Sequence, residues 1–108
     1  MAGIITFIGL QFVQAGSAGD VKKGEAAFKK ATCAGCHPGG GNLMNPKAPL
    51  KGPHFAHEFK DDAKIEHVVR TGIKGTPMPG FDKKRLSDED LKDIVAYLRS
   101  LTPGSGKK

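Results

Sequence analysis

Apolar side chains recur at helical spacing in several stretches of the chain, and the clearest stretch lies near the C-terminal end. Its stripe consists of Leu91, Ile94, Val95, Leu98 and Leu101, which share one face of a helix. Ser87 supplies a capping hydroxyl ahead of the acidic run 88–90, and negative charge favours the N-terminal end of the helix dipole. Pro103 cannot continue the helix. The pattern therefore predicts a helix that begins after Ser87 and ends before Pro103.

Three further helices are predicted upstream. Asp20 can cap the first, which runs over about 21–32, and Asp61 or Asp62 can begin the third, which Gly72 ends. The apolar positions behind these predictions are Val21, Gly24, Phe28 and Ala31 for the first helix, Phe55 and Phe59 for a short second helix, and Ile65, Val68 and Val69 for the third. Helices without any alternating strand pattern predict an all-α domain.

The pattern of the N-terminal stretch 1–18 indicates a secretory leader. It is apolar, carries no charged side chain, and ends in the small residues of Ala15-Gly16-Ser17-Ala18. It is also shorter than the roughly 20 residues that span a bilayer, which favours a cleaved leader over a retained anchor. We expect a signal peptide over 1–18, one domain over 19–102 and a mobile tail over 103–108, in a protein that is exported.

Composition and charge limit the classes of function that the chain can have. The chain carries 17 Lys and Arg against 11 Asp and Glu, a net charge of +6, and its lysines are scattered rather than set in a stripe between aromatics. That distribution is typical of a solvated surface and disfavours nucleic-acid binding. With 15 Gly, no Trp and only 108 residues, the domain is near the size at which side chains alone form a marginal core. A large buried cofactor would add to that core.

Candidate chemistry lies in Cys33-Ala34-Gly35-Cys36-His37. Cys-x-x-Cys-His is the spacing that holds haem through two thioether bonds, with the histidine as an iron ligand. Residues three apart lie on one face of a helix, which suits attachment along one edge of the macrocycle.

Three other uses of the two cysteines stay open at this point. A dithiol redox pair would need a βαβ context, which the chain lacks. A zinc site with His54, His57 or His67 lacks the usual second pair of ligands. A plain disulfide is the third alternative. Of the four, haem attachment is favoured.

A second axial ligand would close the iron to substrates. Met78 lies between Pro77 and Pro79, and the two prolines stiffen the loop that carries it. Stiffness matters because ordering a flexible segment costs about 1–2 kcal/mol per residue, which one weak thioether bond offsets poorly. Met44 follows His37 too closely to reach the opposite haem face with ease. Met78 is therefore the predicted ligand, and His57 and His67 are the alternatives.

The chain resembles the class I c-type cytochromes in Cys33-Ala34-Gly35-Cys36-His37, in the Pro77-Met78-Pro79 loop, and in the stretch from Leu86 through Ser87-Asp88-Glu89-Asp90 to Ala96-Tyr97-Leu98. The similarity covers nearly all of 19–102 and is strongest to small, soluble, single-haem members of bacterial periplasms and thylakoid lumens. Glycines 39–41 with Asn42 resemble the luminal type, whereas the longer loop from Gly72 to Met78 is more similar to periplasmic members.

The resemblance implies a fold and a role. The first and last helices would cross, with Gly24 allowing close approach and Phe28 packing beside Tyr97. Cys33 and Cys36 would anchor one haem c, with His37 and Met78 as the iron ligands. The protein would carry single electrons between donor and acceptor proteins and would not be an enzyme. We expect a periplasmic location, with the thylakoid lumen as the alternative.

Finer roles follow from the same resemblance. A backbone carbonyl orients the proximal imidazole in the family, and Pro53 is the candidate here, although a plain turn proline is an equal alternative. Without Trp, the groups that could meet a haem propionate are Asn42, Arg70 and Lys74. The basic residues that could rim an exposed haem edge and steer acidic partners are Lys47, Lys51, Lys83, Lys84 and Arg85.

Overall fold

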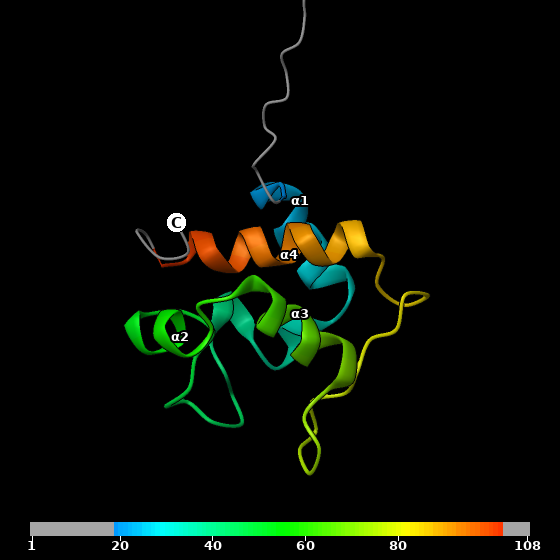
Figure 1. Ribbon diagram of the computed structural model, residues 1–108. Helices are drawn as coiled ribbons and strands as arrows, with labels where there is room; N and C mark the ends of the chain where they lie inside the picture. Colours follow the sequence, from blue (N-terminus) through cyan, green and yellow to red (C-terminus); the bar gives the residue numbers. More distant parts are fainter. Residues whose placement is uncertain (1–18, 103–108) are drawn as a thin grey trace, which may run out of the picture.

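All regular structure in the computed structural model, which describes residues 19–102, is helical (Figure 1). The elements in chain order are α1 (Val21–Lys30), η2 (Cys33–Gly35), η3 (Pro38–Gly40), α2 (Pro53–Glu58), α3 (Asp62–Thr71) and α4 (Asp88–Ser100), η2 and η3 being 3₁₀ turns. The all-α prediction is confirmed. The predicted leader, 1–18, and the predicted tail, 103–108, lie outside the described residues. None of the helices within 19–102 is long and apolar enough to cross a membrane.

Of the three helices for which an N-cap is predicted, α1 and α4 have the side-chain cap, whereas Asp61, at the N-cap of α3, makes no side-chain cap hydrogen bond. The Asp20 side chain accepts a hydrogen bond from the Lys23 amide at 2.9 Å, and the Ser87 hydroxyl accepts one from the Asp90 amide at 3.0 Å. Each bond satisfies an amide that the first helical turn leaves without a partner. Helix α1 ends at Lys30, earlier than expected, because Thr32 adopts a left-handed conformation with φ of 70°. That reversal turns the chain into the cysteine segment.

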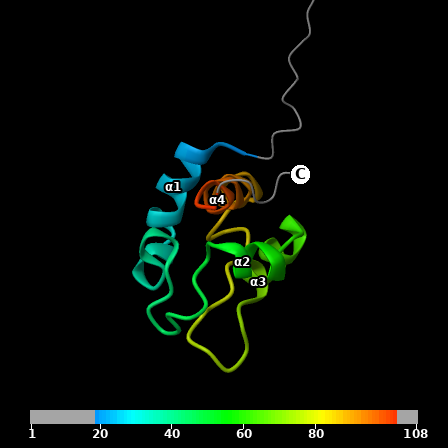
Figure 2. The same ribbon diagram turned by 90° about the vertical axis from the view of Figure 1, so that its left-hand side faces the viewer.

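Helices α1 and α4 cross in close contact (Figures 1 and 2). A Cβ atom on Gly24 would lie 1.8 Å from the Asp93 carbonyl oxygen, so only glycine permits this approach. One turn further, the Phe28 and Tyr97 rings pack with centroids 5.2 Å apart and planes tilted by 56°, a favourable aromatic geometry. These contacts confirm the expected crossing. Val21, predicted on the same inner face, is 43% exposed instead.

The hydrophobic core lies between α4 and the other helices. Its buried members are Phe28, Phe55, Ile65, Phe81, Leu86, Leu91, Ile94, Val95, Tyr97 and Leu98. Around them, partly buried, pack Ala27, Ala31, Cys33, Ala34, Leu50, Phe59, Val69, Met78 and Leu101. Cys33 and Met78, which are 45 positions apart in the chain, thus border one core.

Two arginines bond parts of the fold that lie far apart in the sequence. Arg99 donates from Nε to the Asp62 carboxylate at 2.9 Å and from Nη2 to the Phe59 carbonyl at 2.6 Å, which joins α4 to the link between α2 and α3. Arg70 donates from Nη1 to the Phe81 and Leu86 carbonyls at 3.0 and 2.6 Å. Because these carbonyls lie in a segment without helix or strand, the guanidinium groups supply the partners that regular structure would provide.

Candidate functional site

The turn after α1 brings Cys33, Cys36 and His37 together. The Cys33 carbonyl accepts hydrogen bonds from the amides of Cys36 at 3.2 Å and of His37 at 2.9 Å, so the five residues form one tight turn. Both thiols are free, with Cys33 partly buried and Cys36 exposed. The predicted spacing is therefore realised on a 3₁₀ turn rather than on a continuous α-helix.

The environment of Cys33 does not suit a reactive dithiol. Burial raises the pKa of the Cys33 thiol above its ordinary value, a change that the backbone hydrogen bond at Cys33 opposes only in part. The thiolate is the nucleophile in thiol–disulfide exchange, so a raised pKa makes the group less reactive. The described residues also contain no strand, and hence no βαβ unit of the thioredoxin kind.

His37 is oriented by a backbone carbonyl. Its Nδ1 lies 2.8 Å from the Gly41 oxygen, and since a carbonyl only accepts, Nδ1 carries the proton. The other ring nitrogen, Nε2, is then the basic one, as a metal ligand requires. The carbonyl expected in this role was that of Pro53, which instead begins helix α2. Glycines 39 and 40, both with positive φ, fold the chain back so that Gly41 reaches the ring.

Met78 is held on a separate loop that extends from the end of α3. Its carbonyl accepts from the Ile73 amide at 3.2 Å and its amide donates to the Thr76 hydroxyl at 3.2 Å. Thr76 in turn donates from that hydroxyl to the Ile73 carbonyl at 2.8 Å. Both backbone polar groups of Met78 are thus tied within the loop, so its position is set by more than the flanking prolines.

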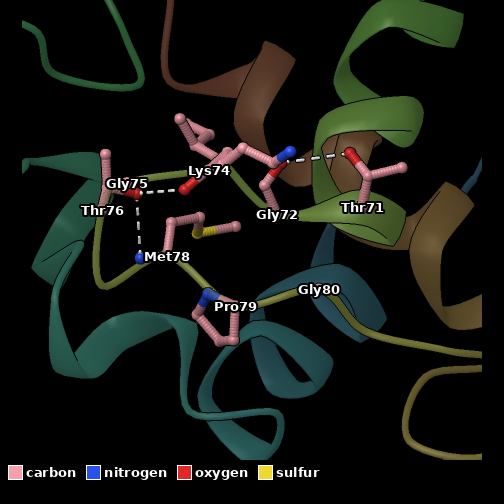
Figure 3. Close-up of a pocket in the computed structure, with 9 residues that line it drawn as sticks. Thr71, Gly72, Lys74, Gly75, Thr76, Met78, Pro79 and Gly80 are labelled. Carbon is pink, nitrogen blue, oxygen red and sulfur yellow. Dashed lines mark hydrogen bonds between the residues drawn. The ribbon is translucent and has the colours of Figure 1, made fainter.

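The same loop surrounds a pocket of about 510 Å³ (Figure 3). Its lining runs from Thr71 to Gly80 without Pro77 and includes the Met78 side chain. Gly72 and Gly80 form the base, where a Cβ on Gly72 would lie 2.7 Å from the Gly80 nitrogen. This loop and the cysteine turn both lie below α4 in Figures 1 and 2. They come from different parts of the chain, and both border the hydrophobic core.

The donor set fits a covalently bound haem. Two free thiols and an imidazole lie in one turn, and a thioether borders the same core from another loop. Within residues 19–102 no three His, Cys, Asp or Glu side chains come together as a metal site, which removes support for zinc. His54, His57 and His67, the histidines considered for zinc, are all exposed, and His57 and His67 are also the alternatives to Met78.

The groups predicted to meet a propionate are arranged differently from one another. Arg70 is occupied by the Phe81 and Leu86 carbonyls and by the Asp88 carboxylate at 2.6 Å. Asn42 donates to the Ala48 carbonyl at 3.0 Å, and Lys74 is exposed on the Met78 loop. Sequence reasoning missed Arg99, whose Nη1 is buried without a hydrogen-bond partner among the described residues. No local motif marks such an arginine, because its partners are the Asp62 carboxylate and the Phe59 and Lys60 carbonyls, which are 37 to 40 positions away.

Three of the five basic residues predicted to rim the haem edge have partners within the protein. Lys83 pairs with Asp88 at 3.4 Å, Arg85 lies over the Phe81 ring at 4.6 Å, and Lys51 donates to the Gly39 carbonyl at 3.0 Å. Lys47 and Lys84 are exposed. The guanidinium of Arg70 first, and then Lys83, hold the pKa of the Asp88 carboxyl below its ordinary value through hydrogen bonds.

The chain is similar in sequence to a known family and to named proteins. A sequence model of the family described as cytochrome C oxidase, cbb3-type, subunit III, matches residues 19–98. The chain is 37% identical over 82 residues to cytochrome c6 of Cyanidium caldarium, covering 75% of this chain and 71% of that protein. It is 35% identical over 98 residues to cytochrome c6 of Pyropia yezoensis, covering 90% and 86%.

A solved structure agrees with the sequence comparisons. Cytochrome c6 from the diatom Phaeodactylum tricornutum superposes with a TM-score of 0.61 at 34% sequence identity, covering 74% of this chain and 91% of that one. The family match over residues 19–98 contains helix α1, the cysteine turn, the Met78 loop and most of helix α4.

Proposed function

The chain belongs to the small class I c-type cytochromes, and on this premise we propose that it is a one-electron carrier with His37 and Met78 as axial ligands. One covalently attached haem c is its cofactor, and the iron supplies the redox chemistry by cycling between its ferric and ferrous states. The relatives named cytochrome c6 support a carrier rather than an enzyme.

One observation carries the proposal: two free thiols and a carbonyl-oriented histidine share a single turn. Cys33 and Cys36 would form the thioether bonds, and His37 would bind the iron through Nε2. The Gly41 carbonyl holds the imidazole tautomer and its ring orientation, as outer contacts do for metal-binding histidines generally. That support limits rearrangement of the ligand when the charge on the iron changes.

Met78 would bind the other face of the haem. Its loop holds the backbone at Met78 by two hydrogen bonds, so little ordering entropy opposes a weak thioether bond. Together with His37, Met78 would keep small molecules from the iron. A methionine ligand also raises the reduction potential relative to a second histidine.

Absorption spectra test the proposal. Protein from an export-competent host is reduced in alkaline pyridine, and the native ferric spectrum is recorded separately. We expect a haem c signature that survives acid-acetone extraction, together with the weak long-wavelength band of sulfur ligation. Absence of that band from the ferric protein would assign the sixth site to another ligand or leave it open, as in a haem enzyme or gas sensor. Alkylation of both cysteines would contradict haem attachment itself.

The partners we propose are redox proteins with acidic docking surfaces, met in the periplasm or in a thylakoid lumen. The net charge of +6 and the exposed Lys47 and Lys84 support an electrostatic encounter. Electron transfer to an acidic acceptor should slow as ionic strength rises, because salt screens exposed charges. A rate that does not change with salt would exclude this mode of docking.

A further inference from the structure

A carboxylate is buried where α1 crosses α4. Asp93 is only 6% exposed, and its Oδ1 accepts a hydrogen bond from the Asp20 amide at 2.8 Å. The ion pairs found within residues 19–102 do not include Asp93. A buried carboxylate is costly unless it is paired with a positive charge or is fully hydrogen-bonded. One neutral amide is a weak partner for this group.

Gly19 lies against the same carboxylate. A substituent placed one bond from its Cα, at the Cβ position, would be 2.8 Å from Asp93 Oδ1 and 2.6 Å from the Lys92 carbonyl oxygen. Those separations are too short for carbon, but they are hydrogen-bond distances for a nitrogen that donates to oxygen. The Asp93 Cα is also 2.8 Å away, so a nitrogen there would need a small outward shift.

A free Gly19 amine can reach that position. The nitrogen and the Cβ position are both tetrahedral substituents on Cα, and rotation about the Cα–C bond exchanges them. While a residue precedes Gly19, its nitrogen is an uncharged amide fixed by the incoming chain. Once the chain begins at Gly19, the nitrogen is an ammonium with three donors and free rotation.

We propose that cleavage between Ala18 and Gly19 creates a charged partner for the buried Asp93 carboxylate, the α-ammonium group of Gly19. Hydrolysis by a signal peptidase consumes one water and leaves a carboxylate on Ala18 and an ammonium on Gly19. The new charge faces Asp93 Oδ1 and the Lys92 carbonyl, so processing completes the α1–α4 crossing. The inference rests on the predicted leader and is independent of which residue binds the iron on the distal side.

The experiment uses haem-loaded protein from an export-competent host. Mass spectrometry first identifies the N-terminus, which we expect at Gly19; a different terminus overturns the proposal. Thermal unfolding is then followed for the processed protein and for the same protein acetylated at its N-terminus, which removes the charge. We expect acetylation to lower the midpoint by several degrees in the wild type and to have little effect in Asp93→Asn.

Asp90→Asn is the matched control. It removes an exposed carboxylate from the same helix, so acetylation should lower its midpoint as much as in the wild type. Equal effects of acetylation in the wild type and in Asp93→Asn, or no effect in either, would overturn the pairing.

A second readout does not depend on stability. Pairing with a carboxylate favours the protonated amine, so near neutral pH an amine-reactive reagent should label Gly19 several-fold more slowly in the wild type than in Asp93→Asn. Equal labelling rates would contradict the pair even if Asp93→Asn proved too unstable for the thermal comparison.

Discussion

Two loops of this protein each carry one methionine, and they present it in opposite ways. In the loop over 42–50 the Met44 side chain is 67% exposed, whereas in the loop over 72–80 Met78 packs against the hydrophobic core. Each loop contains prolines, and each is organised by one polar side chain, Asn42 in the first and Thr76 in the second. Local order alone therefore does not distinguish a candidate ligand from a surface residue.

The difference lies in what each loop is joined to. The Met44 loop is bonded to the cysteine turn through the Leu43 amide, which donates to the Cys36 carbonyl at 2.9 Å, and to the adjoining turn η3 through the Leu50 amide, which donates to the Gly40 carbonyl at 2.6 Å. The Met78 loop is joined to the end of α3, where the Phe81 amide donates to the Val69 carbonyl at 2.9 Å. The proposed ligand Met78 thus lies on a segment separate from the one that carries His37, whereas Met44 lies on a loop bonded to that segment.

Replacing each methionine by leucine is the most direct test of the difference between the two loops. Met78→Leu should abolish the long-wavelength sulfur band and lower the reduction potential by on the order of 100 mV, within the roughly 0.8 V that axial ligands span. Met44→Leu, the matched control, should leave both unchanged. Spectroscopy and redox titration of the two variants check this. Loss of the band in Met44→Leu would exchange the roles of the two loops.

The base of the Met78 loop is the next most sensitive point. Gly72 has φ of 75° and a Cβ there would meet the Gly80 backbone, so Gly72→Ala combines strain with a clash. We expect a loss of about 2–4 kcal/mol in the free energy of unfolding. Gly75→Ala, where φ is 82° but nothing lies within 4 Å, should lose only about 1–2 kcal/mol. Denaturant unfolding measures both, and equal losses would show that the base is not tightly packed.

Removing the polar side chain that organises each loop should cost less stability than the Gly72 substitution. Thr76→Val removes the acceptor of the Met78 amide and should cost about 1 kcal/mol, with the sulfur band lost at a lower temperature than in the wild type. Asn42→Ala removes bonds to Ala48 and Asn45 and should cost a similar amount while leaving the band unaffected. A temperature series of ferric spectra separates the two. The same change in both variants would mean that the loops are coupled.

The smallest effect is expected at Asp88. Its carboxylate accepts a hydrogen bond from Arg70, which also donates to the Leu86 carbonyl in the segment after the Met78 loop. Its pKa is lowered from 3.8 in the folded protein, mainly by Arg70 and then by Lys83. The stability it contributes is therefore present above its unfolded pKa and is lost as the pH falls through its folded pKa. Asp88→Asn should lower the thermal midpoint slightly at neutral pH, and the difference should vanish in acid. A difference that persists unchanged in acid would exclude this ionisation.

Much of the fold could be predicted because its determinants are local. The caps at Asp20 and Ser87 and the apolar stripe on α4 depend on residues a few positions apart. The turn closed by the hydrogen bond from the His37 amide to the Cys33 carbonyl also joins residues only four positions apart. Gly24, Phe28 and Tyr97 were predicted to meet because the family resemblance supplied the crossing, which no single-segment pattern contains.

The parts that could not be predicted depend on backbone angles and on distant carbonyls. The carbonyl beside His37 is that of Gly41 and not Pro53, because two successive glycines adopt positive φ. Glycine permits that conformation without requiring it. Arg70 is one of the three groups that could meet a propionate, and its guanidinium binds three groups between positions 81 and 88. The sequence shows that an arginine is present, whereas its acceptors depend on the completed fold.

The crossing of α1 and α4 also sets the order in which the protein can be completed. The Asp20 amide and the Asp93 carboxylate are 73 positions apart, and Phe28 packs on Tyr97 over a similar separation. An emerging chain therefore cannot complete this crossing until nearly every residue has been released. During that interval the cysteine turn is not enclosed by the final structure, which leaves time for its two thiols to be modified.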